Sequence, residues 1–165
     1  MITSEDIVAI TQSILTTMLE LEATPCEASS STERTDRVSG CVQISGEWQG
    51  AVVVQSSERL ARVFACRLLQ SSEDAVTDAD LRDAFAEMTN MIGGNIKGQV
   101  PCPSFLSIPS VTTGQDFDFH LSGVVAIRDV SLDCNGELLR IMICEEDPTQ
   151  SGRLTQRKLD AVGSK

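Results

Sequence analysis

The longest amphipathic stretch of the chain runs from Thr77 to about Gly98 and predicts an α-helix. At about 100° per residue, its apolar residues share one broad side, which predicts a core-facing surface. These apolar residues are Leu81, Ala84, Phe85, Met88, Met91, Ile92 and Ile96. A second set, which we call the polar stripe, falls within roughly 80° on the opposite side. The polar stripe consists of Asp83, Glu87, Asn90, Gly94 and Lys97.

The residue types of the polar stripe allow two interpretations. Asn and Gly are poor residues for a helix interior, and Gly costs about 1 kcal/mol relative to Ala. The stripe is either an ordinary solvated helix face, as most such faces are, or a functional surface. In the second case, a rigid helix presents the amide of Asn90 and the carboxylate of Glu87 beside an open patch at Gly93-Gly94.

The rest of the pattern predicts two more helices and several strands. A helix is expected from Ser4 to about Leu21, with Thr3 and Asp6 in capping-box spacing, and another from Arg59 to about Gln70. Strands are expected over Arg37–Ser45, Trp48–Gln55, Phe105–Thr112, Leu121–Leu132 and Glu137–Cys144. This order predicts an α+β fold, a mostly antiparallel sheet with the helices packed on one face.

Three short motifs refine the sheet. Asn135-Gly136 predicts a tight hairpin between the last two strands. Pro109 requires a sheet edge, a bulge or a strand end, because proline has no N–H to donate. The continuous run Val52-Val53-Val54 predicts a strand that is buried on both faces.

The polar segments indicate how the domain is organised. The segment 22–36 is rich in polar residues and is expected to be a loop. The segment 148–165 lacks apolar periodicity and is expected to be a loose tail, or a short helix over Leu154–Leu159. We therefore expect one domain over residues 1–147, followed by this tail.

Composition excludes several classes of function. The 165 residues are 41% hydrophobic, which is enough for a sizeable core. A net charge of -11 disfavours binding to nucleic acid or to an anionic membrane surface. No apolar run is long enough for membrane insertion, and no signal-peptide pattern opens the chain, so a cytoplasmic protein is expected.

The six cysteines show no CxxC pair and no zinc-like spacing. His120 is the single histidine, so no metal site is expected. We expect the cysteines to be free and mostly buried, because free cysteine behaves as a small hydrophobe. A catalytic Cys-His pair stays an alternative, although nothing in the sequence places His120 near a particular cysteine.

The polar stripe also carries a family resemblance. Asp83-x3-Glu87-x2-Asn90 resembles the D/S-x3-E-x2-N signature of the CheC/CheX/FliY phosphatases of bacterial chemotaxis. The helix continuation Met91–Lys97, the upstream run SGCVQISGEWQGAVVVQSS and the downstream Leu106–Val111 resemble the same family. Only one helix carries the E-x2-N pair, which favours a CheX-like domain over a two-site CheC.

This resemblance implies a phosphatase acting on the aspartyl phosphate of a phosphorylated CheY-type response regulator. By the same resemblance, Asn90 orients the hydrolytic water, Glu87 contacts a lysine of the regulator and Asp83 supports the contact surface. We add that Gly94 leaves room for the partner and that Lys97 touches the rim. The Mg²⁺ would be supplied by the response regulator, so the chain needs no cofactor of its own. A homodimer through sheet edges is implied by analogy.

Two other functions are compatible with the sequence. One is a non-catalytic response-regulator-binding or adaptor domain of the same fold. The other is a small-molecule-binding or structural α+β domain in which the polar stripe is merely solvated. Under the last hypothesis, Asn90→Ala and Glu87→Ala would leave function unchanged.

Overall fold

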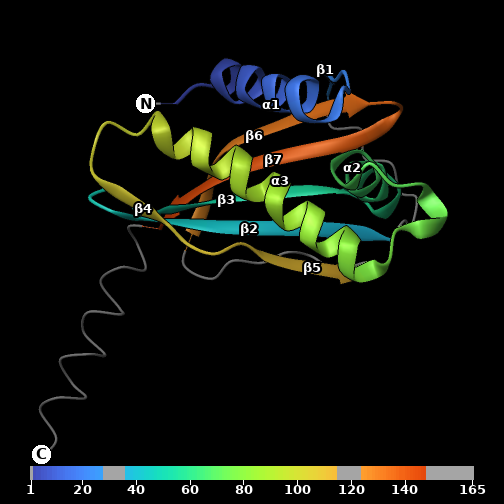
Figure 1. Ribbon diagram of the computed structural model, residues 1–165. Helices are drawn as coiled ribbons and strands as arrows, with labels where there is room; N and C mark the ends of the chain where they lie inside the picture. The colour runs from blue at the N-terminus through green and yellow to red at the C-terminus, as the bar shows by residue number, and fades with distance from the viewer. Residues whose placement is uncertain (1, 28–35, 115–123, 148–165) are drawn as a thin grey trace, which may run out of the picture.

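The computed structural model describes residues 2–27, 36–114 and 124–147. Within these residues, three α-helices cover one face of an antiparallel sheet of seven strands (Figure 1). This arrangement confirms the predicted α+β fold. The predicted tail 148–165, its possible short helix and His120 lie outside the described residues.

The three predicted helices are present, and the second begins at Glu58, one residue before the expected start. They are α1 (Ser4–Leu19), α2 (Glu58–Leu69) and α3 (Asp78–Gly98), with a short 3₁₀ turn, η1 (Glu73–Ala75), before α3. Thr3 caps α1 and Thr77 caps α3, each through a complete capping box. Helix α1 ends two residues earlier than expected, because Glu20 adopts a left-handed conformation at φ 53°.

The strands form one sheet in the order β1-β6-β7-β3-β2-β4, and β5 also pairs with β2. Their bounds are β1 (Thr24–Pro25), β2 (Arg37–Gly46), β3 (Gly50–Ser57), β4 (Ser104–Leu106), β5 (Ser110–Gly114), β6 (Val124–Cys134) and β7 (Glu137–Glu146). Strand β2 thus lies between β3 on one side and the β4 and β5 segments on the other. The predicted hairpin is confirmed, with Asn135 and Gly136 at φ 55° and 79° between β6 and β7.

One strand prediction and part of one loop prediction were wrong. The single strand expected over Phe105–Thr112 is two strands, β4 and β5, separated by a bulge. The pairs Ile44↔Leu106 and Cys41↔Ser110 leave two residues of β2 opposite three of the partner, including Pro109. In addition, residues 24–25 of the expected loop form strand β1, which pairs with β6.

The bulge keeps its hydrogen bonds through a serine side chain. The backbone N–H of Ser107 donates to the carbonyl of Gln43 at 2.9 Å. The Ser107 hydroxyl accepts from the N–H of Gln43, also at 2.9 Å. Pro109 therefore lies in a bulge, where no backbone N–H is required, which is one of the positions predicted for it.

The main core lies between the helices and the sheet. Alternate residues of β2, β3 and β7, such as Val42, Val52 and Ile141, pack against the helices and are fully buried. Val53 points to the other face of the sheet, in a small cluster with Cys41 and Cys144. This cluster confirms that the central strand is buried on both faces.

All six cysteines are free. Burial raises the pKa of the Cys41 thiol to about 11, and burial also raises the pKa of Cys134 and Cys144. A thiol with a raised pKa is a poor nucleophile near neutral pH, because the thiolate is the reactive form. These three cysteines therefore act as small hydrophobic residues.

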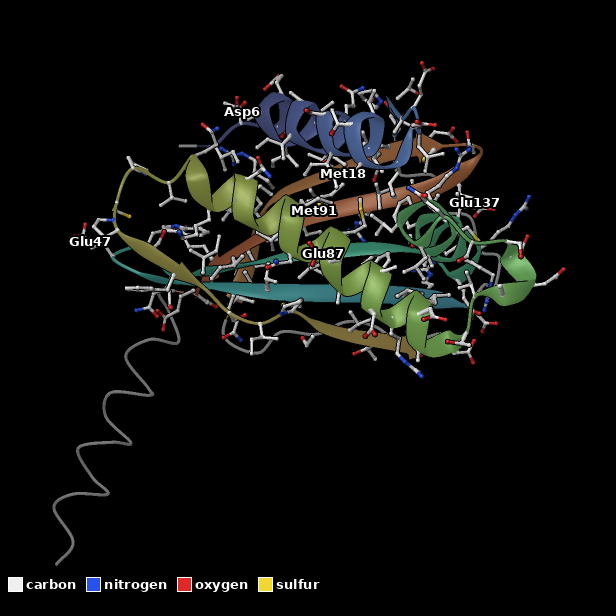
Figure 2. All side chains as sticks on the ribbon, viewed as in Figure 1. Asp6, Met18, Glu47, Glu87, Met91 and Glu137 are labelled. Atoms are coloured by element: carbon white, nitrogen blue, oxygen red, sulfur yellow. The ribbon has the colours of Figure 1, made fainter. Side chains whose placement is uncertain are left out.

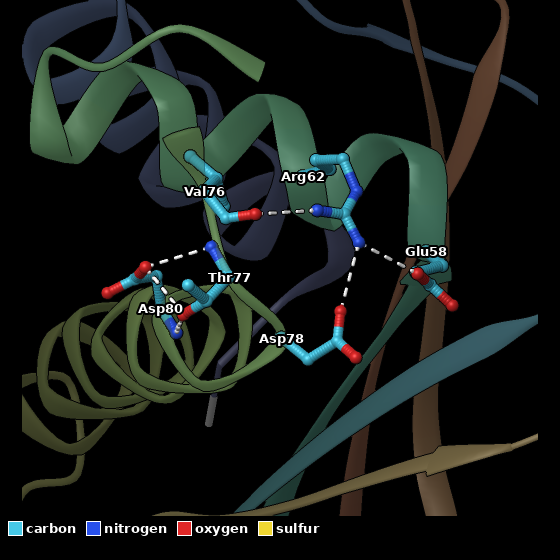
Figure 3. A network of polar contacts seen from close by, with 6 residues as sticks. All are labelled: Glu58, Arg62, Val76, Thr77, Asp78 and Asp80. Atoms are coloured by element: carbon cyan, nitrogen blue, oxygen red, sulfur yellow. Dashed lines mark hydrogen bonds and ion pairs between the residues drawn. The ribbon is translucent and has the colours of Figure 1, made fainter. Parts of the chain in front are cut away.

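A single arginine ties helix α2 to the start of α3 (Figure 3). The Arg62 guanidinium donates to the carbonyl of Val76 at 3.1 Å and to the carboxylate of Glu58 at 3.1 Å. It also donates to Asp78, the first residue of α3, at 3.3 Å. The amino end of α3 is thus fixed by Arg62 as well as by its own capping box.

We predict that Thr77→Ala lowers the free energy of unfolding by about 1 kcal/mol, because the helix loses a capping hydroxyl. The capping box also lowers the pKa of Asp80, through hydrogen bonds from Thr77. The lowered pKa means that the ionised Asp80 carboxylate adds to the free energy of unfolding. This added stability is present above the unfolded-state pKa of Asp80 and is lost as the pH falls through its lower folded-state pKa. Urea denaturation at neutral and acidic pH measures both effects.

The control for this experiment is Thr17→Ala, which removes an exposed hydroxyl from the interior of α1. Because Ala is the better residue in a helix interior, Thr17→Ala should not lower the stability. Equal losses in the two variants would contradict a capping role for Thr77.

Candidate functional site

The structure brings the five residues of the polar stripe to one side of α3, away from the sheet. Asp83 and Glu87 are exposed, and the other three are partly exposed. Glu87 points outward from α3 in Figure 2. The opposite side of the helix is buried to 2% exposure or less at Leu81, Phe85, Met88, Ile92 and Ile96. Because that side is fixed in the core, the polar stripe must face solvent.

The polar side chains of the stripe have no partners within the described part of the chain. Asp83, Glu87, Asn90 and Lys97 make no side-chain hydrogen bond or ion pair there. Some other polar residues of α3 are paired: Asn95, for example, donates to the carbonyl of Met91 at 2.8 Å. The amide and the carboxylates of the stripe are therefore available to another molecule.

The two adjacent glycines have different roles. A Cβ atom on Gly93 would lie 2.4 Å from Cγ2 of Val42, so this glycine is required by packing against β2. A Cβ atom on Gly94 would meet nothing closer than Cδ2 of Leu106, at 4.0 Å. Nothing within the described chain requires Gly94 to be a glycine. It leaves an open patch on the helix, one turn after Asn90.

The residue types of the stripe limit its chemistry. An exposed carboxylate such as Glu87 can bind a cation, and the amide of Asn90 can donate and accept hydrogen bonds at any pH. The five stripe residues include no serine, cysteine or histidine nucleophile. Among the described residues, no group of three or more His, Cys, Asp or Glu side chains is arranged to hold a metal ion. The arrangement suits positioning rather than covalent catalysis.

The edge of the sheet beside α3 adds apolar surface that the sequence pattern did not predict. Leu106 of β4 lies beside Gly93 and Gly94. The neighbouring Phe105 and Ile108 are 73% and 89% exposed, the two most exposed large apolar side chains described. The position of Pro109 was the signal available, because a bulge pushes adjacent side chains out of the strand pattern.

A protein-family model described as chemotaxis phosphatase CheX matches residues 38–128, more than half of the chain. The chain belongs to the CheX family. The matched range contains all of α3 with its polar stripe, as well as β2 from its second residue on, the strand that supports that helix. No curated protein sequence matches the chain.

Solved structures of CheX proteins have the same fold. CheX from Vibrio vulnificus aligns with a TM-score of 0.69 at 23% identity, over 85% of this chain and 93% of that one. CheX from Desulfovibrio desulfuricans aligns with a TM-score of 0.68 at 24% identity, over 87% of this chain and 98% of that one. A third structure is the CheX-CheY-BeF3-Mg²⁺ complex from Borrelia burgdorferi, with a TM-score of 0.66 at 21% identity, over 86% and 97%.

No helix among the described residues is both long enough and apolar enough to span a membrane.

The contrast between the two glycines can be tested by stability. Gly94→Ala should raise the free energy of unfolding by up to about 1 kcal/mol, because Ala is the better helix residue and its methyl meets no close atom. Gly93→Ala should lower it by about 1–3 kcal/mol, because its methyl overlaps Val42 in the core. Urea denaturation of the two variants makes the comparison, and a similar loss in both would show that Gly94 is also a packing residue.

Proposed function

We propose that this chain is a phosphatase that hydrolyses the aspartyl phosphate of a CheY-type response regulator in chemotaxis or two-component signalling. The observation that carries the proposal is the pair Glu87 and Asn90, about one turn apart on a rigid helix and free of partners within the described chain. Membership in the chemotaxis phosphatase family CheX supports it. The same proposal places the chain in the cytoplasm, with its partner.

In this mechanism, Asn90 enters the active site of the response regulator and orients the attacking water by a hydrogen bond. Phosphoryl transfer leaves little covalent work to the protein, so catalysis is mostly positioning and charge stabilisation. An amide suits this task because it is neutral and adds no negative charge beside the phosphoryl group. A stripe without its own nucleophile is consistent with such a reaction.

Glu87 forms an ion pair with a lysine in the partner's site. Docking removes water from this pair, which strengthens the charge-assisted hydrogen bond. Because Glu87 has no partner within the described chain, docking breaks no existing interaction of its side chain. Asp83 supports the contact surface and Lys97 touches its rim, while Gly94 leaves room for the partner to approach the helix.

The metal ion of this reaction belongs to the partner. Mg²⁺ bound by the response regulator neutralises charge on the phosphoryl group, and the chain supplies no cofactor of its own. The Borrelia burgdorferi complex, which contains CheX, CheY, BeF3 and Mg²⁺, supports the assignment of the metal ion to the response regulator.

We predict that the wild-type chain accelerates dephosphorylation of a Mg²⁺-bound, phosphorylated response regulator. Asn90→Ala should lower the rate constant about 100-fold or more while binding persists, because positioning of the water is lost. Glu87→Ala should weaken binding, since truncating one partner of a buried charge pair costs about 2–5 kcal/mol. Two quantities are measured across a panel of regulators: the rate at which the phosphorylated regulator loses its phosphate, and the affinity of the chain for the regulator.

Asn95→Ala is the matched control, because Asn95 lies on the same helix, outside the polar stripe, and bonds to Met91. It should leave the rate and the affinity unchanged. Binding without acceleration by the wild type would instead support the adaptor function. If the wild type neither binds nor accelerates any regulator of a broad panel, both functions are overturned.

We also propose that the chain forms a homodimer through the edge of the sheet at β4. Among the described strands, β4 lies at the end of the sheet order and is paired only with β2. An open edge with exposed apolar side chains is a template for pairing with another strand. Phe105 and Ile108 supply those side chains, and pairing with a second copy would bury them in a two-fold interface.

Sedimentation velocity at micromolar concentration tests the dimer. Phe105→Glu and Ile108→Glu should each convert the dimer to a monomer, because a charge would be buried at the interface. Val125→Glu, at an exposed position of β6, is the matched control and should leave the dimer intact. A monomeric wild type would overturn the dimer and leave the phosphatase proposal unaffected.

A further inference from the structure

Helix α3 approaches strand β2 closely at two points. A Cβ atom on Gly40 of β2 would lie 2.0 Å from Oγ1 of Thr89 and 3.0 Å from its Cβ. A Cβ atom on Gly93 of α3 would lie 2.4 Å from Cγ2 of Val42. The strand thus lacks a side chain where the helix inserts one, and the helix lacks a side chain where the strand inserts one. We call these four residues the glycine seat.

The residue that enters β2 is rigid. Thr89 is fully buried, and its hydroxyl donates to the carbonyl of Phe85 at 2.8 Å. A β-branched side chain has few rotamers in a helix, and this hydrogen bond selects one of them. Thr89 lies directly before Asn90 in the sequence, so the seat is adjacent to the polar stripe.

Gly40 lies well inside the sheet. It pairs with Val54 of β3 on one side and with Val111 of β5 on the other. Glycine weakens a strand interior because it contributes no side chain and loses more entropy on folding. Close approach of α3 is the compensating contact at this position. A bulkier residue would hold the helix further from the sheet.

We propose that Thr89 and Gly40 are positioning residues, which fix the rotation of α3 and thereby aim Asn90 at the phosphoryl site. This inference rests on the proposed phosphatase function. Helical side chains reach about 5–6 Å from the helix axis, so a rotation of about 10° moves the Asn90 amide by about 1 Å. A misplacement of about 1 Å can reduce a rate about 100-fold.

The seat controls rotation because the amino end of α3 is held separately. Arg62 and the capping box fix the first turn of the helix, more than two turns before Thr89 (Figure 3). A contact between atoms close to the two backbones leaves the helix little freedom to rotate, whereas long side chains between a helix and a sheet can change rotamer and absorb a rotation. The glycine seat therefore sets the direction in which the middle of α3 presents the stripe.

The test is Gly40→Ala, which forces Oγ1 of Thr89 to retreat by about 1 Å or more to reach an allowed contact distance. We expect kcat for dephosphorylation of the response regulator to fall about 10- to 100-fold. The dissociation constant should change less than about threefold, because the longer Glu87 side chain can readjust by rotation about its extra bond. A purely structural role would not separate kcat from binding in this way.

Rescue and control variants sharpen the result. Gly40→Ala with Thr89→Ala removes the overlapping Oγ1 and leaves a tight Cβ–Cβ contact of 3.0 Å, which requires a much smaller shift of the helix, so this double variant should recover part of the lost kcat. Gly98→Ala is the matched control, because a Cβ atom there has no neighbour within 4 Å, and kcat should not change. A loss in Gly40→Ala that the double variant does not reduce at all would overturn the proposal.

A second readout does not depend on activity. The side-chain amide resonances of Asn90 in NMR spectra of the free chain should shift in Gly40→Ala and return in the double variant. Unchanged resonances in a folded Gly40→Ala chain would overturn the inference. If the wild type accelerates no regulator, the phosphatase proposal fails and these resonances still decide whether the seat sets the position of Asn90.

If Gly40→Ala does not fold, Thr89→Ala tests the same contact by loosening it. We expect kcat to fall about three- to tenfold with little change in affinity, because Asn90 is then held less firmly. An unchanged kcat in Thr89→Ala would overturn the proposal.

Discussion

The packing of α3 against β2 is the contact on which the rest of the structure depends. Reciprocal glycines at positions 40 and 93 bring the helix down onto the strand, where Thr89 and Val42 occupy the space that side chains would otherwise fill. Phe85, Met88 and Ile92 then enter the core together. Because the buried side is set by these contacts, the direction of the polar stripe follows from them.

A site on one side of one helix has simple physical requirements. Exposed Asp, Glu and Asn side chains are solvated by water, so leaving them unpaired carries little energetic penalty. The weak helix propensity of Asn90 and of the two glycines is offset elsewhere in α3, by its capping box, its buried apolar side and the Arg62 network. The chain can thus hold a stable scaffold and still keep polar groups free for a partner.

The edge of the sheet links the stripe to a second exposed surface. The bulge between β4 and β5 lets both segments pair with β2, and Ser107 supplies the acceptor that Gln43 needs. Leu106 turns inward beside α3, while Phe105 and Ile108 remain exposed. One short segment therefore supports the helix and also presents apolar surface at the edge of the sheet.

The sequence by itself determined the helices, their caps, the Asn135-Gly136 hairpin and which side of α3 faces the core, because these features depend on local periodicity and on residue conformation. Only the tertiary structure decided three others. The bulge at Pro109 depends on the register with β2, and the two-residue strand β1 exists only by pairing with β6. Adjacent glycines look alike in the sequence, yet Gly93 faces Val42 and Gly94 faces open space. A local pattern specifies the apolar side of an element, whereas the atoms that pack against it come from distant parts of the chain.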